Sequence, residues 1–392
     1  MKMWSTHCFL FNFDEMFLKS LFYFYKIFGV APMTLDSTKN RPSDVSFAYS
    51  KFGILYNLFL VILTIFAFYQ CAILVHFDVS VGMDFQRFVN TTHLIFFVFT
   101  TLIVLIIFCV RQERAVALAN RLSSIYYLNK NIKLSAILPS IKGIVSMTFI
   151  TTIMWLVTTP YDDAHLLTYY VAISLYNFVI NSVFLQYSVL LKLLYHLYRS
   201  LNTDLRSLLE SLDIAIEMDR HSNNEIKLTS GRLKRLREIH MLLCHLSGDV
   251  ADFYSLPIFF CITNAFFVLI IYSYYVFRGF AIAIMPVLVT VHCTTMMVVI
   301  VVSLTILLRT ASVTAAESRV SGEIVSESMA SCSNQFIGRQ LEVLSIYFLH
   351  KNVKFCVFNL YSLDESLLMS IVGVITTYLM ILLQLDGSSN CK

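Results

Sequence analysis

The last apolar stretch of the chain, residues 366–385, carries the side chains with the most specific chemical potential in this sequence. In an α-helix, 100° per residue places its small and polar side chains within about 40° of one line. This stripe consists of Ser366, Ser370, Gly373, Thr377 and Gln384. The opposite face is aliphatic and consists of Leu368, Ile371, Ile375, Leu379 and Leu382. A helix of this kind can border water on one side and lipid or protein on the other.

A hydrated path for ions would need several copies of this helix around an axis, because one helix cannot enclose a pore. Met380 and Ile381 would then form an apolar constriction that gates by dewetting. Gln384 would place a neutral amide just outside it, and Asp386 would add a ring of negative charge that favours cations. Small residues at this spacing also fit close helix–helix packing. The stripe alone therefore leaves the pore and the packing interpretations open.

Polar residues mark the start of the same helix. Ser362 and Glu365 have the spacing of a capping box, which predicts that the helix starts there. Asp364 and Glu365 also suit the positive end of the helix dipole. In the pore interpretation these two acids would place negative charge at the inner mouth.

Patterns typical of enzymes or metal sites do not accompany the stripe. The nine cysteines are scattered without a C-x-x-C pair, so neither a zinc cage nor a disulfide scaffold is predicted. His240 and His245 are five residues apart, which is not the i, i+4 spacing of a helical metal pair. No Ser/His/Asp or paired-carboxylate motif lies in an apolar stretch. We therefore expect no enzymatic activity, no metal and no cofactor.

The elements that position the stripe are predicted to be membrane helices. Hydrophobic residues make up 57% of the chain and charged residues 14%, against about 45–50% and about 25% in a soluble domain. The net charge of +4 is far from that of a nucleic-acid binder. Seven apolar stretches are long enough to cross about 30 Å of hydrocarbon: 52–76, 91–110, 138–158, 166–191, 253–277, 281–308 and 366–385. The predicted fold is an all-α polytopic membrane protein with seven transmembrane helices.

The distribution of cations predicts the orientation. All but four of the 29 Lys and Arg residues fall in the N-terminal segment and the loops after the second, fourth and sixth spans. The exceptions are Arg87, Lys142, Arg278 and Lys392. By the positive-inside rule the N-terminus is cytoplasmic and the C-terminus extracellular. This orientation argues against a G-protein-coupled receptor, whose N-terminus lies outside.

Three inner segments, 111–137, 192–251 and 309–365, are long, and amphipathic helices are predicted in the second and third. After the fourth span, leucines and a tyrosine recur with a period of 3.6 from Leu191 to Leu212. We expect a cytoplasmic anchor whose helices cover one another or, as we favour, bundle between subunits. The predicted organisation is an N-terminal segment 1–51, a six-helix ligand-binding region 52–308, the anchor segment 309–365, the last helix 366–385 and an extracellular tail 386–392.

The two ends of the chain resemble the insect gustatory receptor family. Residues 377–385, TYLMILLQL, are similar to the family's C-terminal signature of Thr-Tyr, five hydrophobic residues and Gln-Phe. The preceding FNLYSLDESLL and, near the N-terminus, YKIFGVAP also resemble the family. Leu385 replaces the family's final Phe, and Leu379 stands where many sugar-sensing members carry an acid. This second departure disfavours the sugar-sensing clade.

The resemblance implies a ligand-gated, non-selective cation channel of four subunits in the plasma membrane of chemosensory neurons, with the last helix of each lining one central pore. A small-molecule tastant would bind in the outward-facing half of the other helices. Aromatic and polar residues there are the pocket candidates: His93, Phe97, Thr152, Trp155, Tyr169, Tyr170, Tyr272, Tyr275, Thr290 and His292. Expected partners are lipid, cations, and further copies or sister receptors. An odorant-receptor-like subunit and a transporter stay as alternatives.

One further site is predicted on the outer side. Asn90, Thr91 and Thr92 form a glycosylation sequon at the lip of the second span. A chance match to this short motif is the alternative.

Overall fold

The computed structural model describes residues 19–36, 46–77, 84–128, 164–217, 223–281, 287–331, 335–351 and 353–389, with scattered positions between 139 and 157. Its helices are α2 (Lys51–Phe77), α3 (Asp84–Val110), α4 (Gln112–Leu128), α6 (Ala164–Glu217), α7 (Asn223–Ala281), α8 (Val287–Ser331), α9 (Gln335–His350) and α10 (Glu365–Ser389). Four strands pair as two small antiparallel sheets: β1 (Thr34–Asp36) with β2 (Ser46–Ala48), and β3 (Cys356–Val357) with β4 (Tyr361–Ser362). The all-α prediction is confirmed, with these short sheets as additions.

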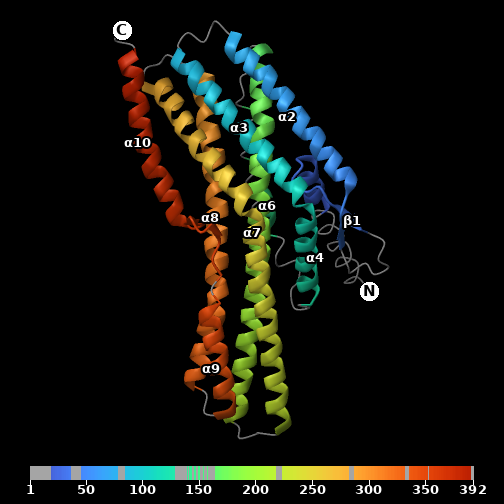
Figure 1. Ribbon diagram of the computed structural model, residues 1–392. Coiled ribbons are helices and arrows are strands. Elements are labelled where there is room, and N and C mark those ends of the chain that lie inside the picture. The colour runs from blue at the N-terminus through green and yellow to red at the C-terminus, as the bar shows by residue number, and fades with distance from the viewer. Residues whose placement is uncertain are drawn as a thin grey trace, which may run out of the picture.

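Three long helices, α6, α7 and α8, run side by side through the length of the molecule (Figure 1). At one end, α2, α3 and α10 flank them. At the other end α9 is the one further helix of the described residues that accompanies them. The C-terminus lies at the end that holds α2, α3 and α10.

Six of the seven predicted spans coincide with helices that are long and apolar enough to cross a membrane. These helical stretches are Lys51–Ile73, Phe88–Val110, Leu175–Ser211, Leu228–Phe280, Val289–Ala330 and Glu365–Gln384. The remaining prediction, 138–158, falls largely outside the described residues. At its C-terminal end the last helix is longer than predicted, since α10 continues to Ser389. Asp386 therefore lies on the helix and not in a separate tail.

The helices α6, α7 and α8 have 54, 59 and 45 residues, far more than the roughly 20 that a bilayer requires. Most members of the apolar stripes predicted on α6, α7 and α9 are buried, and with α8 these helices form a second core beyond the predicted spans 166–191, 253–277 and 281–308. Its buried members are Leu205, Leu208, Leu209, Leu233, Ile324, Val325, Ile337, Leu341, Leu344 and Phe348. The amphipathic helices thus cover one another within a single chain, and their bundling between subunits stays a prediction.

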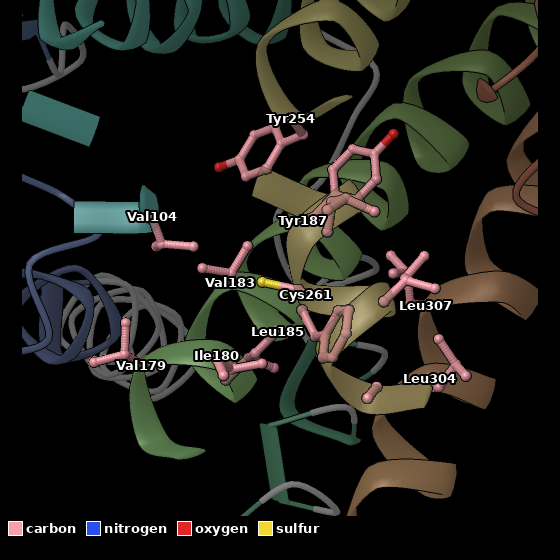
Figure 2. Packing of buried hydrophobic residues seen from close by; sticks show 14 of the residues in the cluster. Val104, Val179, Ile180, Val183, Leu185, Tyr187, Tyr254, Cys261, Leu304 and Leu307 are labelled. Carbon is pink, nitrogen blue, oxygen red and sulfur yellow. The ribbon is translucent and has the colours of Figure 1, made fainter. Parts of the chain in front are cut away.

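The main core lies where α3, α6, α7 and α8 meet (Figure 2). Val183 and Tyr187 of α6 face Cys261 and Tyr254 of α7 there. The rings of Tyr187 and Tyr254 stack with centroids 4.7 Å apart. Branched and aromatic side chains at this density fix the relative positions of the four helices.

Near the N-terminus, residues 28–33 form an irregular segment held by amide side chains from three helices. Asn57 of α2 donates to the Gly29 carbonyl (2.7 Å), Gln186 of α6 to the Val30 carbonyl (3.1 Å), and Gln112 of α4 to the Pro32 carbonyl (2.6 Å). Val30 and Ala31 are almost fully buried. Non-helical backbone can be buried only if its polar groups are satisfied, and these three side chains supply the donors.

Candidate functional site: the last helix and the outer half of the bundle

The aliphatic face of α10 attaches it to the rest of the chain. Ile371 is buried and belongs to the main core. Leu368, Ile375, Leu379 and Leu382 are half-buried against the same core, where α10 packs on α7 and α8. The face that was expected to meet lipid or protein therefore packs on protein.

The opposite stripe of α10 is exposed. All five of its members, Ser366, Ser370, Gly373, Thr377 and Gln384, are exposed, and so are the predicted constriction residues Met380 and Ile381. Leu385 and Asp386 lie on the helix, and their side chains are outside the described part of the structure. The stripe is thus available to water, to lipid or to another copy of the chain.

Hydroxyl groups on α10 bond to the helix itself. Thr376 and Thr377 both donate to the Gly373 carbonyl, at 2.7 Å and 3.2 Å, and Ser370 donates to the Ser366 carbonyl at 3.1 Å. Back-bonded hydroxyls are tolerated in apolar surroundings and still have lone pairs for water.

The start of α10 differs from its prediction. Because the helix begins at Glu365, Asp364 is its N-cap, and the predicted capping box of Ser362 with Glu365 is wrong. The Asp364 carboxylate accepts from the Ser366 amide at 3.0 Å and from the hydroxyls of Ser362 and Ser366. These donors, led by the Ser362 hydroxyl, lower the pKa of the Asp364 carboxyl. Ser362 assists the cap indirectly, since its hydroxyl orients the carboxylate.

A hairpin precedes this cap and ties it to α7. Strands β3 and β4 are joined through Phe358 and Asn359, which have positive φ angles of 49° and 56°. The Phe358 amide donates to the Ser255 hydroxyl of α7 at 3.0 Å. A bulky residue in the left-handed region is costly, so the tertiary bond to Ser255 helps to hold the connection between α9 and α10.

Three of the ligand-pocket candidates lie together between α3 and α7. His93 has its ring centroid 4.6 Å from that of Phe97 and 5.3 Å from that of Tyr272. All three side chains are buried. The Nε2 atom of His93 is buried without a hydrogen-bond partner. An imidazole among aromatic rings with an unsatisfied nitrogen offers both an apolar wall and one polar contact to a small molecule.

A second group of candidates lies where α7 ends and α8 begins. Thr290 and His292 are buried on the first turns of α8. A Cβ atom on Gly279 of α7 would come within 2.1 Å of the Thr290 hydroxyl, so only glycine permits this approach. Arg278, which sequence reasoning assigned to a loop, is instead buried and donates to the Tyr274 hydroxyl at 3.1 Å. A single cation between two predicted spans gave no periodic signal.

The other candidates are placed less fully. Tyr275 donates to the Asn90 side-chain oxygen at 2.5 Å, which joins α7 to α3. Asn90 is half-buried on a helix, and its glycosylation stays a prediction. Thr152 and Trp155 lie outside the described residues, as do the side chains of Tyr169 and Tyr170 on α6.

The fold and the sequence agree on a class of membrane receptor. The sequence model of the 7tm chemosensory receptor family matches residues 18–387. The chain belongs to this family, which confirms the resemblance at family level and makes the protein a receptor and not an enzyme.

Two solved structures share the fold. The insect olfactory receptor OR5 from Machilis hrabei superposes with a TM-score of 0.68 at 14% identity, and its complex with eugenol with 0.71 at 13%. Both matches cover 95% of this chain and 98% of the other. No curated protein sequence matches the chain.

Proposed function

We propose that this receptor is a ligand-gated, non-selective cation channel in which four copies of α10 surround a central pore. The supporting observation is the division of α10 into a largely half-buried aliphatic face that packs on α7 and α8 and an exposed stripe of small and polar side chains. A membrane helix whose polar side faces away from its own chain is suited to a hydrated axis shared with other copies. Each copy contributes an equivalent stripe, as the rotational symmetry of homo-oligomers requires.

Within this pore, Met380 and Ile381 are the proposed constriction. Both are exposed and apolar, and a ring of such side chains closes a narrow path by expelling water. Gln384 follows one turn further along, and Asp386 gives negative charge near the C-terminal mouth. Leu385 takes the place of the family's aromatic residue, so the constriction here is proposed to be purely aliphatic.

The ligand is proposed to bind at the end of the bundle that carries His93, Phe97 and Tyr272, with Thr290 and His292 nearby in the fold as further candidates. The eugenol complex of OR5 is a precedent for a small aromatic ligand in a receptor of this fold. Residue resemblance at the C-terminus favours a gustatory subtype, with a small-molecule tastant. The likeness to OR5 keeps the odorant-receptor-like alternative, which would require a sister subunit.

The proposed orientation places the N-terminus and the long extensions of α6, α7 and α8 in the cytoplasm of a cell bearing the receptor at its plasma membrane. The distribution of Lys and Arg supports it. Epitope tags at both ends of the chain test this. Staining of intact cells should reveal the C-terminal tag, and the N-terminal tag should appear only after permeabilisation. The reverse pattern would refute both the topology and the pore.

Single-channel recording in planar bilayers tests the pore with purified protein. Gln384→Ala should change the unitary conductance or open time, and Asp386→Asn should lower the cation current. Leu382→Ala on the half-buried face of α10 is the matched control, and its conductance should stay near that of the wild type. Unchanged unitary currents in both stripe variants would remove α10 from the pore, and fluxes no faster than a transport cycle would favour a transporter.

Two expression formats separate the subtypes. Cells that express this chain alone should respond to members of a tastant panel with an inward cation current. A response to volatile odorants only upon co-expression of an olfactory partner subunit would support the alternative.

A further inference from the structure

Four cationic or titratable side chains gather on adjoining faces of α6 and α8. Lys192, His196 and Arg199 follow one another at helical spacing on α6, and Arg309 lies on α8. The positive charges of Arg199 and Arg309 both act on Lys192, and those of Lys192 and Arg199 act on His196. The group is therefore one electrostatic cluster, and its members repel one another.

Tyr195 organises this cluster. The Lys192 ammonium lies over the Tyr195 ring, 4.2 Å from its centroid, and Arg199 donates to the Tyr195 hydroxyl at 3.3 Å. The aromatic ring thereby holds two cations on the same side of α6. His196 adds a buried Nε2 atom that has no hydrogen-bond partner. Arg199 and Arg309 are exposed, whereas Lys192 and His196 are half-buried.

The cluster lies at a membrane boundary on both helices. Lys192 is the first charged residue of α6 after the uncharged stretch 166–191, and Arg309 is the first of α8 after 287–308. The Thr314 hydroxyl of α8 donates to the Leu191 carbonyl of α6 at 3.0 Å, which brings the two boundaries to about the same height. Cations at this level meet the headgroups of the leaflet on the side of the long extensions.

Two cations after α3, Arg111 and Arg121, are treated differently by the fold, because both have partners on α7. Arg121 of α4 forms an ion pair with Asp249 of α7. Arg111 donates to the backbone carbonyls of Asp252 and Phe253. In the described part of the chain, by contrast, no acidic side chain lies within ion-pair distance of Lys192, Arg199 or Arg309. Uncompensated cations held close together at a headgroup level indicate an anionic partner from outside the chain.

We propose that Lys192, His196 and Arg199 of α6, together with Arg309 of α8, bind the phosphate-bearing headgroup of an anionic phospholipid. The arginines and the lysine supply charge-assisted hydrogen bonds to phosphate oxygens, and the imidazole of His196 contributes a further polar contact. A lipid bound here would bridge α6 and α8 and relieve the repulsion among the cations. This assignment is independent of the pore proposed for α10.

Titration of fluorescent phosphatidylserine into the full-length protein in a neutral detergent tests the site, with fluorescent phosphatidylcholine as the uncharged comparison. The double variant Lys192→Gln with Arg309→Gln should weaken phosphatidylserine binding about 25-fold, because each surface cation contributes about fivefold to the affinity. Arg121→Gln is the matched control, because it removes one positive charge from the same membrane level. The affinity of Arg121→Gln for phosphatidylserine should stay within about twofold of that of the wild type. Lys192→Gln alone should lower this affinity about fivefold.

Three results would overturn the assignment. Equal affinity in the double variant would show that the lipid binds elsewhere, and equal weakening in Arg121→Gln would reduce the effect to net charge. Displacement of the lipid by inorganic phosphate at comparable concentration would indicate a site for free anions. Lys192→Arg with Arg309→Lys retains both charges, so it should fold and bind like the wild type and thus separates binding from misfolding.

Discussion

Replacing Asn57 by Ala tests how the buried N-terminal segment 28–33 is held. The Asn57 side chain is fully buried and donates to the Gly29 carbonyl at 2.7 Å. Without the Asn57 amide, the Gly29 carbonyl loses this donor. Gly29 has a φ of 75°, so it cannot be part of a regular helix. The loss is therefore one tertiary hydrogen bond between the segment and α2.

The expected cost follows from two scales. Leaving a buried acceptor unsatisfied costs about 1–3 kcal/mol in soluble proteins, whereas interhelical hydrogen bonds in membranes average about 0.6 kcal/mol with a maximum of about 1.7. Because the segment borders the membrane stretch, we expect about 1–2 kcal/mol. This corresponds to a change of roughly 5- to 30-fold in the ratio of folded to unfolded protein.

Asn177→Ala is the matched control. Asn177 is also a buried asparagine, but it donates to the Ile173 carbonyl of its own helix at 3.1 Å. Both variants lose the same atoms, so the difference between them isolates the bond to Gly29.

Thermal unfolding in detergent is measured with a thiol-reactive fluorophore, since Cys71, Cys261 and Cys293 are buried until the chain opens. Asn57→Ala should melt about 2–4 °C below Asn177→Ala. Equal melting temperatures, or a lower one for Asn177→Ala, would refute the reasoning.

Two further changes test the ends of the functional helices. Gly279→Ala should lower the melting temperature and the ligand response, because the new Cβ meets the Thr290 hydroxyl at 2.1 Å and such overpacking costs about 1–3 kcal/mol. Adding Thr290→Ala should restore the stability. Failure of that rescue would exclude the clash as the cause. Asp364→Ala should destabilise the first turn of α10 by about 1 kcal/mol, with faster hydrogen exchange over 365–370, whereas Asp364→Asn should keep the cap. The pKa of Asp364 is lowered in the folded state. The stabilisation that depends on the Asp364 charge is therefore present above the unfolded pKa of about 3.9 and is lost as the pH falls below that value. Exchange rates over 365–370 that change across this pH range only as the intrinsic exchange chemistry does would contradict this.

The features of the sequence with a strong period were the ones that could be predicted. Apolar length gave six membrane helices in the described chain, and the 3.6-residue period gave the continuation of α6 through Leu201 and Leu205, both buried. The two faces of α10 were predictable for the same reason. Periodicity reports which side of a helix meets apolar surroundings, and it does so without knowledge of the partner.

Contacts between distant residues carried no such signal. In the sequence, Asn57, Gln112 and Gln186 look like any other amide side chains in apolar stretches. Their hydrogen bonds to segment 28–33 could not be predicted, because the acceptors lie up to 156 residues away. The sequence assigned the N-cap to Ser362 because Ser362 and Asp364 both suit this position. The choice between them depends on the hairpin, in which Ser362 is the last residue of β4. Likewise, the buried position of Arg278 depends on Tyr274, which it contacts only once α7 is helical.

The weak attachment of α10 to its own chain bears directly on its role. In a bilayer, lipid tails are as apolar as leucine, so a helix is positioned by close packing and polar contacts and not by the hydrophobic effect. Ile371 is the single buried side chain in the described part of α10. The hydroxyl groups of Ser370 and Thr376 bond within the helix. A helix held so lightly can change its tilt at low energetic cost, and its exposed stripe gains further contacts from lipid, from water or from neighbouring copies. Light attachment on one face and a polar stripe on the other are what a pore helix that moves during gating requires, whereas a helix that only braces the bundle would bury its small residues.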